Sequence, residues 1–304
     1  MKKYLLNLTT ILMVAIMSGG FVSCGDDDDN PAPMTNAGVL DKNSGLRVLS
    51  VGYYTFEYDS KGRINYVSED SYYGYKFTYN PNKMISEHHG EEERSYTVGY
   101  NGNGYISSLS YNDSDEDRVR TGTVTFSYDA EGHLTQVSET CKKRYYDERS
   151  DGSWQYTCTM TWKNGRLTKA VDKYKEEEDG EYETATLTCT FNYSDYAMEN
   201  YYNKYLQIPP SIILRTIEVD GAEFMAYVGL LGNGPKYLPS SAELVEVENE
   251  NGKEKRKERF YSFSYGFNTD GSLSYCNDNG THYSYSYTHS SGADSHKAPN
   301  VMQD

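Results

Sequence analysis

The sequence predicts an all-β protein: a large antiparallel β-meander of hairpins curled into a barrel-like sheet, with a short helical insert near residues 208–231. Three observations lead to this prediction. An aromatic pair that runs into a tight turn recurs between residues 54 and 287, the residues flanking each aromatic are mostly polar, and 32 of the 304 residues are tyrosine. Tyrosine supplies buried ring area while keeping a polar tip, so it can build a core in a chain that is otherwise polar.

The first copy of the repeated phrase is residues 54–64. Phe56 and Tyr58 are two residues apart and therefore share one face of a strand, whereas Thr55 and Glu57 point to the other face. Residues 59–62 fit a type I turn, with aspartate at its first position and glycine at its last, where a positive φ is needed. We expect a tight hairpin with a bulge at the glycine.

The phrase recurs with variations. Asn164-Gly165 is typical of a two-residue type I′ turn, and Lys83 departs from the pattern by standing where other copies have glycine. The further copies cover residues 77–85, 98–106, 126–134, 160–167, 191–193, 265–273 and 285–287. An aromatic face opposite a polar face indicates an antiparallel sheet with one buried and one solvated side.

The return strands argue against a lipid-facing outer surface. A transmembrane strand needs about 9–11 residues with apolar side chains at every second position. Residues 134–140 carry only one good apolar residue per face. We therefore expect the aromatic face to point inward, in a water-soluble sheet.

Residues 194–247 interrupt the repeat. Pro209 and Pro210 exclude a central strand there, and residues 222–231 favour two to three turns of helix that end at Gly232. We expect this apolar insert to pack on the aromatic face as a plug. Farther on, residues 243–247, with two glutamates, and the mainly basic residues 253–259 flank Asn251-Gly252, which predicts a hairpin with cross-strand ion pairs. A nucleic-acid partner is not expected, because the formal net charge of the chain is −16.

The N-terminal residues have the pattern of a targeting segment. Lys2 and Lys3 precede an apolar run over residues 5–17, which is shorter than the ~20 residues of a membrane span. Residues 21–24 resemble the lipobox of bacterial lipoproteins, with phenylalanine in place of the usual leucine. This resemblance implies cleavage before Cys24, a lipid on Cys24, and anchorage in a membrane through that lipid.

An acidic run follows the lipobox directly. It is either a solvated tether or, by resemblance, the export signal of Bacteroidota surface lipoproteins; its residues are Asp26, Asp27, Asp28 and Asp29. The resemblance implies an outer-membrane lipoprotein exposed on the cell surface. The expected organisation is a signal peptide over 1–23, an acidic flexible tether over 24–45, an antiparallel β domain over 46–290 and a disordered tail over 291–304.

Four cysteines lie beyond the lipobox. Cys158 and Cys189 each stand four residues before the second aromatic of their copy, so both are expected on the buried face. They are interpreted either as a cross-strand disulfide, if their strands are neighbours, or as buried free thiols.

Residues 58–64 and 128–132 resemble the YD repeat of secreted shell-forming proteins. The whole arrangement over residues 46–290, including Gly229–Ser241, is similar to a family of Bacteroidota surface lipoproteins described as having a porin-like β fold. That family has no assigned activity, so the resemblance implies a fold and a location but no functional residue.

The most favoured function is a surface binding module for a glycan or a protein. Tyrosines outside the repeated pairs are the candidate ligand-binding residues, although any one of them can instead be a core residue. They are Tyr53, Tyr72, Tyr73, Tyr145, Tyr146, Tyr201 and Tyr202. A structural or accessory subunit of an envelope complex is the alternative.

An enzyme is the third hypothesis. His88-His89 lie near Glu87 and residues 91–93, which suggests a metal cluster, but adjacent strand residues point to opposite faces. The sequence contains neither a GxSxG nor an HExxH motif. We therefore expect no enzyme activity, no cofactor and no metal.

Overall fold

The computed structural model describes residues 39–41, 46–70, 72–114, 118–146, 151–178, 180–194, 217, 219, 221–250, 252–269 and 272–289. The strands are β1 (Val39–Asp41), β2 (Leu46–Val51), β3 (Tyr54–Tyr58), β4 (Ile64–Ser68), β5 (Tyr73–Tyr79), β6 (Asn82–His88), β7 (Glu91–Tyr100), β8 (Ile106–Ser114), β9 (Arg118–Tyr128), β10 (Leu134–Tyr145), β11 (Gly152–Lys163), β12 (Arg166–Glu178), β13 (Glu181–Asn192), β14 (Ser241–Glu250), β15 (Lys253–Phe267), β16 (Leu273–Asp278) and β17 (Thr281–His289). A helix, α2, spans Ala222–Tyr227.

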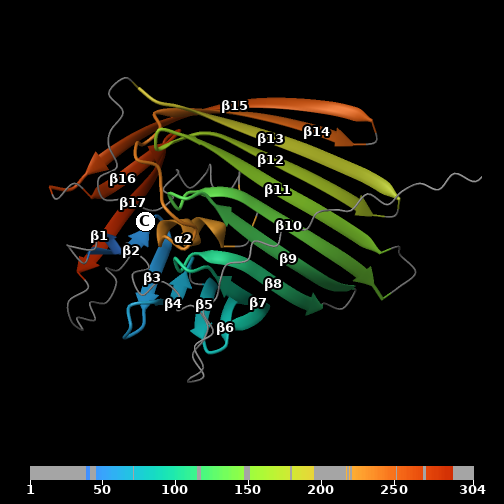
Figure 1. Cartoon of the computed structure of the whole chain (residues 1–304), viewed down its shortest axis with the longest axis horizontal. Helices are drawn as coiled ribbons and strands as arrows, with labels where there is room; N and C mark the ends of the chain where they lie inside the picture. Colours follow the sequence, from blue (N-terminus) through green and yellow to red (C-terminus); the bar gives the residue numbers. More distant parts are fainter. Residues whose placement is uncertain are drawn as a thin grey trace, which may run out of the picture. The chain divides into compact units, whose positions relative to one another are not determined.

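Within these described residues the strands close into an antiparallel barrel (Figure 1). Each strand from β2 to β17 pairs with the next one, and β17 pairs with β2, which makes sixteen strands in the described part of the ring. β1 pairs with β2 as a further strand and lies within the stretch expected to be tether. The predicted all-β antiparallel fold, with its short helix inside residues 208–231, is confirmed.

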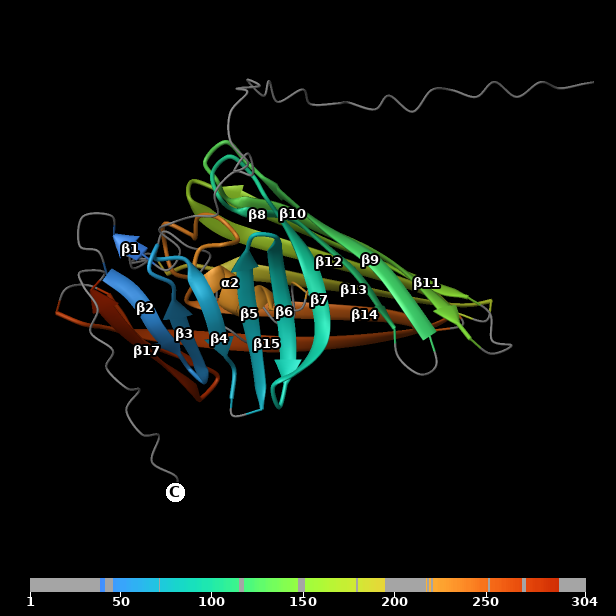
Figure 2. The ribbon, with the colours of Figure 1, turned by 90° about the horizontal axis from the view of Figure 1, so that it is seen from below.

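The barrel has two different ends. The turns that follow β3, β7, β9 and β11 all lie at one end, here called the turn end, because consecutive strands alternate in direction. The opposite end is called the far end. Strands β9 to β15 have 10 to 15 residues, whereas β2 to β6 have 5 to 7, so one side of the barrel is longer (Figure 2).

Side chains alternate between the barrel interior and the outside. On β9, Val124 and Phe126 are buried, while Thr121, Thr123 and Thr125 are exposed. The aromatic faces of the repeated pairs point inward, as expected. This alternation is the reverse of that in transmembrane barrels, which place apolar residues outside and polar residues inside.

The repeated turns have the geometry that the sequence predicts. Asp59 Oδ1 accepts hydrogen bonds of 2.9 Å from the backbone N–H groups of Lys61 and Arg63, and Gly62 has a φ of 78°. Gly62 N donates to Asp59 O at 2.8 Å and Asp59 N donates to Arg63 O at 2.7 Å, which gives the expected bulge at the glycine, and the register of β3 and β4 shifts once more next to Tyr58. Asn101 and Asp129 make the same backbone bonds in their own turns.

Two turns differ in length from the others. Asn164 and Gly165 have φ values of 53° and 71°, which confirms the predicted two-residue type I′ turn. The copy that carries Lys83 turns through Asn80-Pro81, so that Tyr79 pairs with Asn82 and no glycine bulge is needed.

A second hydrogen bond recurs with the aromatic pairs. The second aromatic donates to the carbonyl of the apolar residue that opens the return strand of the preceding hairpin, as in the 2.7 Å bond from the Tyr128 hydroxyl to Ile106 O. The other bonds of this kind join Tyr79 to Ile64, Trp162 to Leu134, Tyr193 to Leu167 and Tyr287 to Leu273. These bonds join neighbouring hairpins at the turn end.

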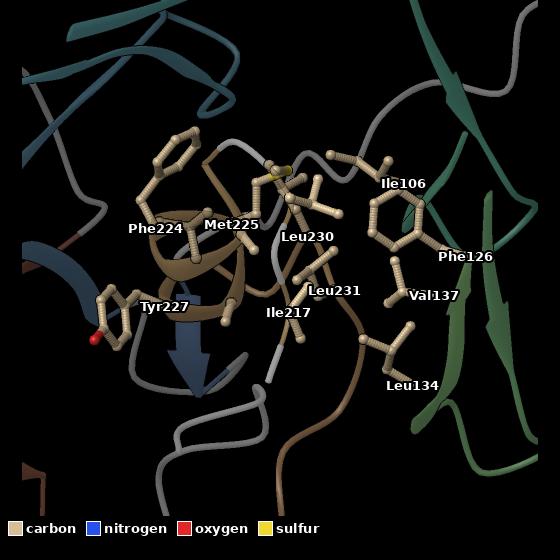
Figure 3. Close-up of a cluster of buried hydrophobic side chains, with 14 of the residues drawn as sticks. Ile106, Phe126, Leu134, Val137, Ile217, Phe224, Met225, Tyr227, Leu230 and Leu231 are labelled. Carbon is tan, nitrogen blue, oxygen red and sulfur yellow. The ribbon is translucent and has the colours of Figure 1, made fainter. Parts of the chain in front are cut away.

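The described part of the insert, which includes α2, packs inside the barrel. All six residues of α2 are buried, and Phe224 contacts the rings of Tyr75 and Phe77 on the inward face of β5. In Figure 3, Leu230 and Leu231 point toward Ile106, Phe126 and Val137, whereas Phe224 and Tyr227 point to the other side of the helix. The expected packing of the insert against the aromatic face is confirmed.

The segment after α2 is bonded to three of the repeated turns. Leu230 O accepts from Ile106 N at 2.9 Å, Asn233 N donates to Gly132 O at 2.8 Å, and Lys236 N donates to Gly165 O at 2.7 Å. Gly232 fits this contact because a Cβ there would lie 2.4 Å from Gly132 O. The turn end therefore holds the plug by backbone hydrogen bonds.

The two cysteines expected on the buried face are not bonded to each other. Cys158 and Cys189 are buried free thiols, and β12 separates their strands, so they are not cross-strand neighbours.

The hairpin of β14 and β15 carries the expected cross-strand ion pairs. Lys257 lies 2.9 Å from Glu248, and Arg259 lies 3.2 Å from Glu246.

Candidate functional site

A pocket inside the barrel is the strongest candidate site. Its volume is about 240 Å³. The residues that line it are Arg94 and Tyr96 of β7, Val124 of β9, Glu139 of β10, Trp154 and Tyr156 of β11, Tyr174 of β12, and Val219, which precedes α2. Four aromatic rings, one guanidinium group and one carboxylate thus face the same space.

Strand register brings these residues together. Directly paired residues on antiparallel strands lie on the same face. One inward row runs Val124, Glu139, Tyr156, Tyr174 across β9 to β12. A second row, two residues closer to the far end, runs Tyr96, Tyr111, Gly122, Cys141, Trp154, Glu176 across β7 to β12.

Gly122 makes room for a ring in the second row. A Cβ at this position would lie 2.2 Å from Cζ of Tyr111, so the tyrosine lies across the glycine backbone. The Tyr111 hydroxyl then reaches Glu139 and donates to Oε1 at 2.8 Å. Burial, Cys141 and Glu139 together raise the pKa of Tyr111 far above its ordinary value, so its hydroxyl stays protonated as a donor.

Arg94 is held by an acidic partner. Its Nε lies 2.6 Å from Asp113 Oδ2, and the same carboxylate oxygen is 3.0 Å from Nη2 of Arg120. Arg94 also donates to the hydroxyl of Tyr96 at 3.0 Å. Burial opposes the charge of Arg94, but Tyr96 and Asp113 more than offset burial and raise its pKa, so the guanidinium remains charged.

A second ion-pair group lies beside Trp154. Lys143 Nζ is bonded to Glu176, lies 3.1 Å from Glu178, and is 5.1 Å from the centre of the Trp154 ring. The Tyr174 hydroxyl also donates to Glu176. Burial favours the neutral form of Lys143, but the two carboxylates outweigh burial and raise its pKa.

The charges that border the pocket are therefore already paired with one another. Arg94 has Asp113, Glu139 has the Tyr111 hydroxyl, and Lys143 has two glutamates. Such bonds fix the side chains before any ligand arrives, which reduces the entropy lost on binding. Chemically, the pocket offers ring faces and oriented hydrogen-bonding groups.

The tyrosines singled out from the sequence lie elsewhere. Tyr72, Tyr73 and Tyr146 are 54%, 44% and 61% exposed, and Tyr53 is exposed as well. Tyr145 differs from the expectation because it is buried, with its hydroxyl donating to Glu178. Tyr72 and Tyr73 come together with His88 and His89 at the far end.

Several sequence-based expectations fall on other parts of the chain. Tyr201, Tyr202, Cys24 and the four aspartates at 26–29 lie outside the described residues. Within the described residues, no group of three or more His, Cys, Asp or Glu side chains is arranged to hold a metal ion. No helix in that part of the chain has the length and apolar character of a membrane span.

Sequence reasoning missed the pocket residues, although a signal was present. Cys158 lies four residues before Trp162 on the same inward face, as the alternation predicts. Counting six and eight residues back along β11 reaches Tyr156 and Trp154, which lie on that face too. This alternation holds only as far as a strand continues, and the sequence does not show that β11 extends back to Trp154.

Comparisons with known proteins find a family model and similar solved structures. The family model described as "Domain of unknown function (DUF4595) with porin-like fold" matches residues 56–275. A crystal structure of a porin-like protein from Bacteroides uniformis ATCC 8492 is 16% identical, covers 85% of this chain and 99% of its own, and has a TM-score of 0.47. A porin-like protein from Bacteroides vulgatus ATCC 8482 is 14% identical, covers 79% and 98%, and has a TM-score of 0.48. No curated protein matches the chain.

Proposed function

The chain belongs to the family of domains of unknown function with a porin-like fold, and we propose that it is a lipid-anchored surface protein that binds a neutral glycan in the barrel pocket. One observation supports this proposal above all. Trp154, Tyr156 and Tyr174 gather on one inward surface beside charges that already have partners.

The chemistry of the pocket favours a sugar over a charged ligand. A sugar ring has an apolar C–H face that can lie on an aromatic ring, and hydroxyls at its edge that can bond to fixed polar groups. Ligand sites typically combine apolar or aromatic walls with a few placed polar groups. A charged ligand would have to compete with the Asp113 and Glu176 ion pairs, whereas a neutral one need not.

The volume of the pocket limits the size of the bound group. Sites for drug-sized ligands measure roughly 300–1,000 Å³. At about 240 Å³ this pocket is smaller. We therefore expect it to hold one sugar residue of a longer chain, with the remaining residues extending out of the pocket.

The location is part of the proposal. It is supported by the lipobox-like residues 21–24 and by the acidic run after Cys24. A lipid on Cys24 would tether the barrel to the outer membrane, and the run of aspartates would direct it to the cell surface. There the barrel would meet glycans from outside the cell.

Calorimetric titration of the purified protein with neutral and acidic oligosaccharides of dietary and host origin tests the proposal. We expect saturable binding of a neutral oligosaccharide. Trp154→Ala should weaken it by about 2 kcal/mol, roughly thirtyfold, as for an aromatic residue at the centre of a binding site. Tyr146→Ala, at an exposed tyrosine outside the pocket, should leave it unchanged. Failure of the whole neutral panel, or binding that survives Trp154→Ala, would count against the pocket.

A further inference from the structure

Four aromatic side chains form a continuous exposed cluster at the far end, here called the aromatic rim: Tyr72, Tyr73, His88 and His89. The ring centres are 4.5 Å apart for Tyr72 and His89, 4.2 Å for His89 and His88, and 4.4 Å for His88 and Tyr73. Tyr72 and Tyr73 remain about half exposed within this cluster. The ring surface is therefore open to solvent and contributes little to the core.

Backbone bonds hold the rim in place. Asp70 Oδ1 accepts from the N–H groups of Tyr72 at 2.6 Å and Tyr73 at 2.8 Å. These two bonds lower the pKa of Asp70, which keeps it ionised. The N–H of His89 donates to Tyr72 O at 2.6 Å and joins the two neighbouring connections. The rim is thus preorganised for binding.

Carboxylates lie in and next to the rim segments along the chain: Glu69, Asp70, Glu87, Glu91, Glu92 and Glu93. Glu93 Oε1 lies 3.7 Å from His88 Nδ1, and Asp70 interacts electrostatically with His88 and His89. Glu87 and Glu92 are direct cross-strand partners, although like charges at such positions destabilise a sheet. Between residues 69 and 93 the lysines are Lys76 and Lys83, and both alternate with inward-facing residues and so point outward. A cation supplied by a partner would offset this repulsion.

We propose that the aromatic rim binds a lysine or arginine side chain from a basic segment of a partner protein. A cation is attracted to the face of a tyrosine ring, and more strongly where carboxylates surround the ring. A neutral sugar could stack on the rings and donate hydrogen bonds to the carboxylates, but only a cation would offset their charge. The rim is separate from the pocket, so this inference does not depend on glycan binding.

The test uses an amidated hexa-arginine peptide as the probe, titrated into the purified protein at 150 mM salt. The double variant Tyr72→Leu/Tyr73→Leu removes two rings and should weaken binding about tenfold. Tyr72→Phe/Tyr73→Phe keeps both rings and should bind as the unmodified protein does. Tyr182→Leu is the matched control, because Tyr182 is 51% exposed and lies between two glutamates at the start of β13.

A second set of variants removes charge and keeps the rings. Glu91→Gln/Glu92→Gln should weaken peptide binding and should also stabilise the fold, because it relieves the repulsion with Glu87. Trp154→Ala should leave peptide binding unchanged, which separates this inference from the glycan pocket. Equal binding by the leucine variant, the Tyr182→Leu control and the unmodified protein would overturn the proposal, and so would saturable binding of a neutral oligosaccharide that the leucine variant loses.

Discussion

The hydroxyl of Tyr128 donates a 2.7 Å hydrogen bond to the backbone carbonyl of Ile106, which opens the return strand of the preceding hairpin. The ring of Tyr105, the residue before Ile106, lies 5.2 Å from the ring of Tyr128. In other copies of the repeat, the residue equivalent to Tyr105 also covers the ring of the second aromatic: Arg63 lies over Tyr79, and His133 stacks on Trp162. The second aromatic of the repeat is thus bonded at its tip and covered on its face.

Removal of the Tyr128 hydroxyl, which donates this bond, should lower the free energy of unfolding. Tyr128→Phe keeps the ring but leaves the carbonyl of buried Ile106 without this donor. We expect a loss of about 1–2 kcal/mol in the free energy of unfolding, measured in urea. Tyr146→Phe removes an exposed hydroxyl and should change it by less than about 0.5 kcal/mol. Equal effects of the two substitutions would mean that the bond does not stabilise the barrel.

Gly232 provides a test of how the plug is held. Gly232 and Gly90 both have positive φ, 90° and 81°, so alanine is strained at either position. A Cβ at Gly232 would also meet Gly132 O at 2.4 Å, whereas nothing lies within 4 Å of one at Gly90. Gly232→Ala should therefore destabilise the protein by about 1–3 kcal/mol more than Gly90→Ala does. A smaller effect at Gly232 than at Gly90 would contradict the close packing of plug and turn.

Glu223 predicts how stability depends on pH. This α2 residue is 2% exposed and accepts a hydrogen bond from the Tyr54 hydroxyl. Burial raises its pKa from an ordinary 4.5 to about 7. Between these values the folded protein holds a proton that the unfolded chain has lost, so the free energy of unfolding falls as pH rises from about 4.5 to about 7 and then levels off.

The expected size of this fall is about 3 kcal/mol, at about 1.4 kcal/mol per pKa unit. The amide of Glu223→Gln does not titrate, so this variant should lack that part of the pH dependence of the free energy of unfolding, as measured by urea unfolding at several pH values. Glu131→Gln, at a carboxylate whose side chain is mostly exposed, should keep the slope. An unchanged slope in Glu223→Gln would show that the carboxyl is not the titrating group.

Much of the fold could be predicted because its information is local. The aromatic pair, the aspartate and the glycine of residues 56–62 determine a strand, a turn and a bulge within seven residues. The alternation of Val124 and Phe126 with threonines likewise indicates which face is buried. Repetition of this unit was enough to predict an antiparallel sheet curled toward a barrel, but closure of the barrel depends on the pairing of β17 with β2 and could not be predicted.

The candidate site could not be predicted in the same way because it depends on register between distant strands. Tyr96 and Trp154 join one inward row only because β7 to β12 pair with particular offsets. Tyr145 was expected to be a ligand residue because it lies outside the repeated pairs, but β10 extends far enough to bury it against Glu178. Strand length is a tertiary property, since it is decided by the neighbouring strands.

The most direct test of the glycan proposal uses the two tryptophans of the chain as reporters. Trp162→Phe leaves Trp154 in the pocket, and Trp154→Phe leaves Trp162, which is stacked on His133 at the turn end. Each variant is titrated with the neutral oligosaccharide that binds best, while tryptophan fluorescence is recorded. A saturable change in the Trp162→Phe variant and none in the Trp154→Phe variant is the predicted result. A change that follows Trp162, or no change with any neutral oligosaccharide, would contradict glycan binding in the barrel.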